Sequence, residues 1–111
     1  MYARVAFFDE HDPAQMDELV RRLDERSRRH AELLPESKAF LTLVDRGAGT
    51  SIGITFFETL EAMEASEQAL ARFPQAYPDS LKGRRVAVDV YEVGVADRPE
   101  AIAASPPPLS A

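Results

Sequence analysis

Residues 40–66, FLTLVDRGAGTSIGITFFETLEAMEAS, decide the fold, because two apolar runs flank a glycine-containing turn and lead directly into a helical pattern. Residues 40–44 and 52–57 are rich in β-branched and aromatic side chains, which favour strands. The segment 45–50 between them contains Gly47 and Gly49, and glycine adopts the positive φ angles that tight turns require. The stretch therefore predicts a β-hairpin.

The segments on either side of the hairpin supply two helices and two more strands. Residues 2–8 predict a first strand, and Asp12, Pro13 and Gln15 form an N-cap, first-turn proline and capping box for a helix that Pro35 ends. Thr59 caps a second helix that continues to residue 73. Residues 74–84 read as a connection, and residues 86–95 as the last strand.

The order β-α-β-β-α-β predicts an α+β, ferredoxin-like fold with a four-stranded antiparallel sheet and both helices on one face. The strands are apolar on both sides, so both sheet faces need cover. We expect a second copy of the chain to cover the face without helices, because that face would otherwise expose a large apolar patch. The side chains assigned to this face are Phe8, Phe40, Val44, Ile52, Ile54 and Phe56.

Length and composition predict one folded domain with a short tail. The chain has 111 residues, of which 45% are hydrophobic and 29% charged, which is ordinary for a globular domain. We assign residues 1–95 to the domain. Residues 96–111 are rich in alanine, proline and serine and are expected to form a C-terminal tail.

Charge and cysteine content narrow the classes of partner. The net charge of −6 disfavours nucleic acid and anionic membrane surfaces as partners. An RNA-recognition domain has the same element order, but here Ile52 and Ile54 occupy positions where such a domain needs stacking aromatics. The chain has no cysteine and begins without a basic and apolar leader, so a cytoplasmic location is expected.

Four segments resemble the antibiotic-biosynthesis-monooxygenase-like family of dimeric α/β barrels. They are Tyr2-Ala-Arg-Val, Leu43-Val-Asp-Arg46, Phe57-Glu-Thr-Leu-Glu-Ala-Met-Glu-Ala-Ser66 and Tyr91-Glu-Val, and the match spans roughly residues 2–95. The resemblance implies a homodimer whose two sheets pack face to face, with a cleft between sheet and helices in each subunit. It also implies a cofactor-independent monooxygenase that acts on a hydroxylated, polyketide-like aromatic molecule.

The chain departs from the haem-degrading members of that family. Those members use an Asn, a Trp and a His, whereas this sequence has no Asn or Trp, and Phe57 stands at the Trp position. Haem degradation is therefore not expected, and no cofactor or metal is predicted. The two histidines, His11 and His30, lie nineteen positions apart, which matches no metal-ligand motif.

The candidate site is a cleft between the first helix and the sheet, with apolar walls that suit an apolar or aromatic small molecule. His30 is the candidate catalytic base, one helical turn from Ser27. A structural role at the helix end is the alternative for His30, and His11 is expected to be a solvated loop residue. A non-catalytic homodimer or a small hydrophobic-ligand-binding module remains the alternative function. The predicted ligand-binding residues are Phe7, Met16, Ser27, Leu41, Leu43, Thr55, Phe57 and Tyr77.

Overall fold

The computed structural model describes residues 1–73 and 77–97. Its four strands are β1 (Tyr2–Asp9), β2 (Ser37–Asp45), β3 (Thr50–Phe57) and β4 (Arg84–Glu92). The helical elements are the 3-10 turn η1 (Pro13–Gln15) and the helices α1 (Met16–Ser27), α2 (His30–Leu33), α3 (Leu60–Arg72) and α4 (Asp79–Lys82). The predicted tail falls largely on residues 98–111, outside the described residues.

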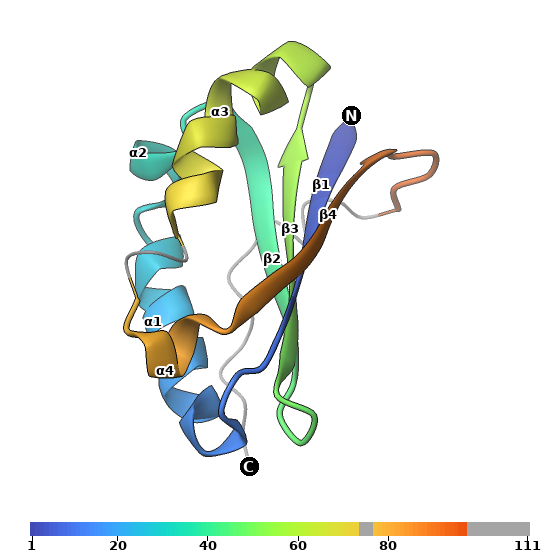
Figure 1. Ribbon diagram of the computed structural model, residues 1–111. Coiled ribbons are helices and arrows are strands. Elements are labelled where there is room, and N and C mark those ends of the chain that lie inside the picture. The colour runs from blue at the N-terminus through green and yellow to red at the C-terminus, as the bar shows by residue number, and fades with distance from the viewer. Residues whose placement is uncertain (74–76, 98–111) are drawn as a thin grey trace.

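The strands form one antiparallel sheet in the order β2-β3-β1-β4, and the described helices gather on one face of it (Figure 1). This confirms the predicted α+β, ferredoxin-like fold. The first and last strands of the sequence, β1 and β4, pair directly, although they are far apart along the chain. In Figure 1 the opposite face of the sheet carries no described helix.

The register of the strands decides which side chains face the helices. Directly opposed residues share a face, and Thr55 lies opposite both Arg4 and Phe40. Ser51 likewise lies opposite Phe8 and Val44. All of these side chains therefore point toward the helices, whereas the alternate residues of each strand form an outer face.

For β1 and β2 the predicted faces were wrong. The helix face carries Phe8, Phe40 and Val44, which we had expected on the open face. The outer face carries Phe7, Leu41 and Leu43, together with Ile52, Ile54 and Phe56. Both faces of these strands are apolar, so the hydrophobic pattern does not indicate which alternate residues face the helices. The register of pairing with β3 determines this instead.

The first helical region is broken near its middle. Asp12 accepts a hydrogen bond from the backbone N–H of Ala14 at 3.0 Å, as an N-cap does, and begins η1. The single helix expected up to Pro35 instead ends at Ser27, and the short helix α2 follows after one turn. On α1, Arg26 is partly buried on the side that faces the sheet, whereas Ser27 is exposed to solvent.

Two clusters of buried side chains fix the helices on the sheet. Phe57, which is fully buried, packs with Leu34, Met63 and Leu70 under α3. A second cluster of Met16, Leu19 and Leu81 joins α1 to α4. The α3 helix starts as predicted, with Thr59 accepting a hydrogen bond from the N–H of Ala62 at 3.1 Å. The two clusters hold opposite ends of the helical layer and leave space between them.

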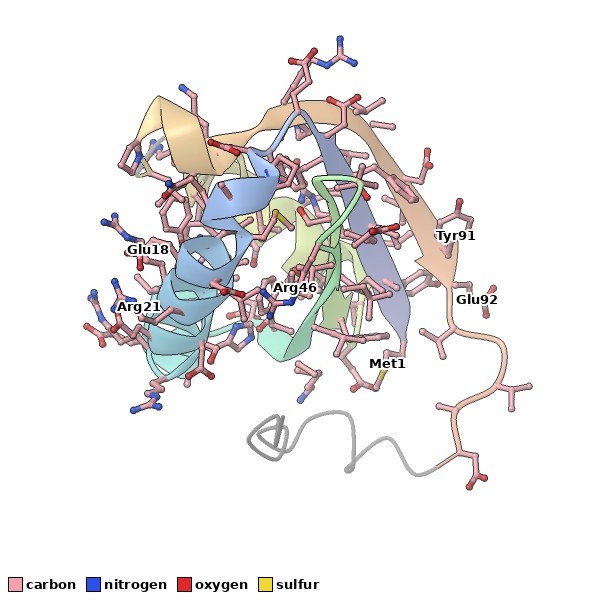
Figure 2. The ribbon with its side chains drawn as sticks, turned by 90° about the horizontal axis from the view of Figure 1, so that it is seen from below. Met1, Glu18, Arg21, Arg46, Tyr91 and Glu92 are labelled. Carbon is pink, nitrogen blue, oxygen red and sulfur yellow. The ribbon has the colours of Figure 1, made fainter. Side chains whose placement is uncertain are left out.

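The outward face of α1 is a network of ion pairs. Glu18 accepts hydrogen bonds from Arg21 and Arg22, which lower its pKa to about 2. Figure 2 shows Glu18 and Arg21 on the side of α1 turned away from the sheet. These arginines are neutralised by carboxylates on their own helix, as their i,i+3 and i,i+4 spacing predicts.

Candidate functional site

A pocket of about 590 Å³, partly open to solvent, lies between the helix face of the sheet and the helical layer. Strands β1, β2 and β3 form its floor, and α1, α3 and the segment that leads to α4 form its walls. Its aromatic residues come from four different elements or connections: Phe8, Phe40, Phe73 and Tyr77. Flat apolar walls of this kind suit a planar aromatic ligand.

Two buried side-chain oxygens have no hydrogen-bond partner among the described residues. They are the hydroxyls of Thr42, on the floor of the pocket, and Tyr77, on its wall. Burying a hydroxyl without a partner costs about 1–3 kcal/mol. Unsatisfied polar atoms that line a cavity indicate that the cavity is suited to a ligand with polar substituents.

Arg26 projects from α1 over three aromatic rings of the pocket. Its guanidinium carbon lies 4.4 Å from the ring centre of Phe73, 5.5 Å from that of Tyr77 and 5.7 Å from that of Phe40. Burial lowers the pKa of this arginine. No carboxylate pairs with it among the described residues. The pocket therefore contains a desolvated positive charge without a counter-ion.

The other arginine of the pocket is neutralised. Arg4 of β1 is 4% exposed and donates two hydrogen bonds to Glu67 of α3, at 2.8 and 3.0 Å. This bidentate pair ties β1 to α3 and leaves little charge for a ligand. Arg26 is therefore the stronger candidate for binding an anion.

A buried histidine and serine lie at the end of the pocket nearest α4. His11 Nε2 is 2.8 Å from Ser51 Oγ, and His11 Nδ1 is 2.9 Å from the carbonyl oxygen of Leu81. His11 is 7% exposed and Ser51 6%, and both line the pocket. The expectation that His11 is a solvated loop residue was wrong, because the backbone turns at Glu10 and directs the ring inward.

Of the predicted ligand-binding residues, Thr55 and Tyr77 line this pocket. Met16 and Phe57 lie instead in the two core clusters, where each is almost completely buried by protein. Their large side chains close the ends of the helical layer and leave the pocket between them.

Three further predicted residues, Phe7, Leu41 and Leu43, lie on the opposite face of the sheet and cannot reach the pocket. This correction follows from the strand register described above. Within the strands that carry them, the pocket is lined by Ala6, Phe8, Phe40 and Thr42.

His30 and Ser27 line a second, smaller cavity of about 220 Å³. His30 Nε2 forms a hydrogen bond with Ser37 Oγ, and its ring stacks on Phe40 at 5.8 Å. Burial, and secondarily the charge of Arg26, lower the pKa of His30. Ser27 is exposed and donates to the carbonyl of Asp24 at 2.6 Å.

The two cavities share part of their lining. Arg26, Phe40 and Phe73 contribute to both, so these three side chains stand between His30 and the main pocket. A ligand in the main pocket would meet Arg26 and the aromatic rings before His30. The role of His30 as a base remains a prediction.

The sequence contained signals for two of the three polar residues that we did not predict. Arg26 has no acidic residue three or four positions away in either direction, unlike Arg21, Arg22 and Arg28 on the same helix. Ser51 shares a strand face with Thr55, which was correctly placed in the cleft. His11 gave no local signal, because its partners are 40 and 70 positions away.

Within residues 1–73 and 77–97, every helix is too short or too polar to cross a lipid bilayer. The same ranges contain no group of three His, Asp or Glu side chains arranged to hold a metal ion.

Comparison with known proteins supports the fold. No protein-family model matches the sequence, and no curated protein matches it significantly. A solved structure from Deinococcus radiodurans, assigned provisionally as an antibiotic biosynthesis monooxygenase, matches with a TM-score of 0.53 and 16% identity, over 88% of this chain and 97% of that one. A second structure, described as an antibiotic biosynthesis monooxygenase, matches with a TM-score of 0.47 and 17% identity, over 87% and 100% of the two chains. The match to the Deinococcus radiodurans structure thus shows that the chain shares its ferredoxin-like fold.

Proposed function

We propose that this protein binds a planar aromatic molecule that carries an anionic or strongly polarised oxygen, in the pocket between sheet and helices. The observation that supports this most directly is Arg26, a desolvated cation that lies over aromatic rings without a carboxylate partner among the described residues. An anionic oxygen on the ligand would supply the missing counter-charge. The rings of Phe40, Phe73 and Tyr77 would contact the flat part of the ligand.

The orphaned hydroxyls of Thr42 and Tyr77 add to this proposal. Each can donate to or accept from an oxygen substituent on the ligand. A hydroxylated aromatic would satisfy groups that an unsubstituted hydrocarbon would leave unpaired. Rejection of the hydrocarbon is expected for that reason.

The chemical activity that we propose is oxygenation by dioxygen without a metal or flavin, as the names of the fold neighbours suggest. In a balanced form, a hydroxyarene and one O₂ yield a quinone and one water. The pocket would bind the deprotonated, electron-rich form of the hydroxyarene, and the Arg26 charge would favour that form. A non-catalytic binding module is the alternative, and the location of His30 behind Arg26, Phe40 and Phe73 favours it.

Matched ligands and matched arginine variants test the binding proposal. We expect 2-naphthoate to raise the melting temperature, and the neutral 2-naphthamide to raise it much less. Arg26→Gln should abolish this difference, whereas Arg28→Gln, which removes an exposed arginine on the same helix, should preserve it. If 2-naphthoate and 2-naphthamide have equal effects on the wild type, the proposed anion recognition is wrong.

Oxygen consumption separates the enzyme from the binding module. Hydroxylated aromatics that bind are incubated with the protein in an oxygen electrode, and quinone formation is followed by absorbance. Binding without oxygen uptake would establish the non-catalytic alternative. Uptake that is unchanged in His30→Ala would refute the prediction that His30 is the base.

We also propose that the protein is a homodimer in which the outer faces of two sheets pack together. That face presents Phe7, Leu41, Leu43, Ile52, Ile54 and Phe56, and Leu43 is 46% exposed in the single chain. Ile54→Glu would place an unpaired charge in the interface and should yield a monomer or insoluble protein. Leu60→Glu, at an exposed position on α3, is the matched control and should remain a dimer in light scattering. A wild-type monomer at micromolar concentration would refute this arrangement.

A further inference from the structure

The His11 and Ser51 pair has a defined hydrogen-bond direction. The Leu81 carbonyl can only accept, so His11 Nδ1, at 2.9 Å, must carry a proton and donate it. In the neutral ring Nε2 is then the acceptor, and Ser51 Oγ at 2.8 Å donates its proton to it. The Ser51 oxygen is left with its lone pairs, which makes it an acceptor toward the pocket.

The backbone around His11 is shaped to hold the ring in this position. Glu10 has a φ of 59°, an unusual value for a residue other than glycine, and directs the next residue inward. Gly49 has a φ of 69°, and a Cβ there would lie 2.3 Å from the His11 carbonyl oxygen. Gly83 has a φ of 63°, and a Cβ there would lie 2.7 Å from His11 Nδ1. Three backbone positions on three segments, Glu10, Gly49 and Gly83, thus accommodate this one histidine.

Arg26 lies at the opposite end of the pocket. Its guanidinium sits over the ring of Phe40, which is directly opposite Thr55 on β3. Ser51 is four residues from Thr55 on the same strand, so the backbone positions of Ser51 and Thr55 are roughly 13 Å apart at about 3.3 Å per residue. One end therefore presents a charged donor and the other an acceptor, with aromatic walls between them.

We infer that the ligand is a hydroxyaryl anion that lies along β3, with its anionic oxygen at Arg26 and a hydroxyl donating to Ser51. This inference rests on the proposed function and specifies the substitution pattern of the ligand. Ser51 accepts the hydrogen bond from the ligand hydroxyl and so favours ligands that carry one. His11 accepts the hydrogen bond from the Ser51 hydroxyl, which leaves the Ser51 oxygen free to act as the acceptor. A ligand without the hydroxyl would leave the buried Ser51 oxygen without this hydrogen bond and should therefore bind less tightly.

Lys82 also lines the end of the pocket near Ser51. Lys82 has an interaction within the protein. A carboxylate bound at Lys82 would reverse the ligand, and Arg26→Gln would then leave the affinity for the carboxylate unchanged. The Arg26→Gln variant therefore also tests the orientation of the ligand in the pocket.

Three naphthalene probes separate the two ends: 6-hydroxy-2-naphthoate carries both groups, 2-naphthoate lacks the hydroxyl, and 2-naphthol lacks the carboxylate. Dissociation constants are measured by fluorescence titration of the full-length protein. We expect the hydroxyl to strengthen naphthoate binding roughly fivefold, the value of one neutral hydrogen bond. Arg26→Gln should weaken binding of both naphthoates roughly tenfold or more. It should weaken binding of 2-naphthol less, because 2-naphthol lacks the carboxylate.

Ser51→Ala should erase the preference for the hydroxyl and keep affinity for 2-naphthoate. Ser51→Cys, which nearly preserves the volume and weakens the acceptor, should give the same result and guards against a folding defect in the alanine variant. Ser37→Ala is the matched control, because it removes the hydroxyl from the other serine–histidine pair, next to His30 and outside the main pocket. It should keep the preference.

The outcomes distinguish this inference from the proposed function. If none of the probes binds, the proposed function fails and the inference fails with it. If the naphthoates bind and the hydroxyl adds nothing in wild type, or its preference survives in both Ser51 variants, only the inference is refuted. Unchanged naphthoate affinity in Arg26→Gln would refute the orientation along β3.

Discussion

Replacing Gly83 by alanine should destabilise the protein and displace His11 from its site. Gly83 has φ 63° and ψ −160°, a combination that is almost restricted to glycine. A Cβ at this position would lie 2.6 Å from the Asp9 carbonyl oxygen and 2.7 Å from His11 Nδ1, both too close for any packing arrangement.

The size of the effect follows from these two observations. Backbone strain at such a residue costs about 1–3 kcal/mol. Moving the His11 ring would also break its buried hydrogen bonds to Leu81 and Ser51, which contribute about 1 kcal/mol each. We therefore expect Gly83→Ala to lower the free energy of unfolding by about 3–5 kcal/mol, as the sum of strain and lost hydrogen bonds.

Urea denaturation of wild type and variant at the same protomer concentration measures this loss. Gly94→Ala is the matched control, because no atom lies within 4 Å of a Cβ built there. Gly94→Ala should change stability by less than about 0.5 kcal/mol. A comparably small effect of Gly83→Ala would show that the backbone near α4 accommodates a side chain, and that His11 is not held as the structure indicates.

Three further predictions concern stability. Phe57→Ala should cost about 3–5 kcal/mol in urea denaturation, because a fully buried ring is removed from the core; a loss below about 1 kcal/mol would place Phe57 outside the core. Glu18 has a folded-state pKa of about 2, below its ordinary value of 4.5, so its contribution to stability is complete above pH 4.5 and is lost as the pH falls through 2. Stability measured over this window should depend less on pH in Glu18→Gln, and an unchanged profile would contradict the ion pairs. Partial burial lowers the pKa of His30, so the stability of the protein should fall as the pH drops below 6.5, the ordinary pKa of histidine. His30→Gln should reduce this loss of stability at low pH. An equally steep loss in the variant would show that other groups cause it.

Several parts of the fold could be predicted from the sequence because they depend on local chemistry. Asp12 and Thr59 are N-caps in the structure, as their positions before helical patterns indicated. The hairpin turn forms around Gly49, which has a positive φ angle. Gly47, the other glycine of the turn, does not have a positive φ. Hydrophobic pattern and caps act over a few residues, so sequence alone determined the order of elements and the ferredoxin-like fold.

The candidate site was only partly predictable. Thr55 and Tyr77 line the pocket. On α1, Arg26 lines it and Ser27 is exposed, and the helix breaks after Ser27. This break has no strong local signal, since no glycine or proline interrupts residues 16–34. The polar side chain of α1 that lines the pocket is therefore Arg26, one residue before the predicted Ser27.

Tertiary structure alone decided the phase of β1 and β2 and the assembly of His11 with Ser51. Adjacent apolar residues such as Phe7 and Phe8 fit either face of a sheet, so their orientation depends on register with β3, a contact between residues more than forty positions apart. His11 joins Leu81 and Ser51 across 70 and 40 positions. The sequence by itself determined the four strands, the two long helices, their order and a sheet with two apolar faces, whereas the short helices α2 and α4 were not predicted. The long-range pairing, which no local pattern encodes, decided which face became the pocket and which polar groups line it.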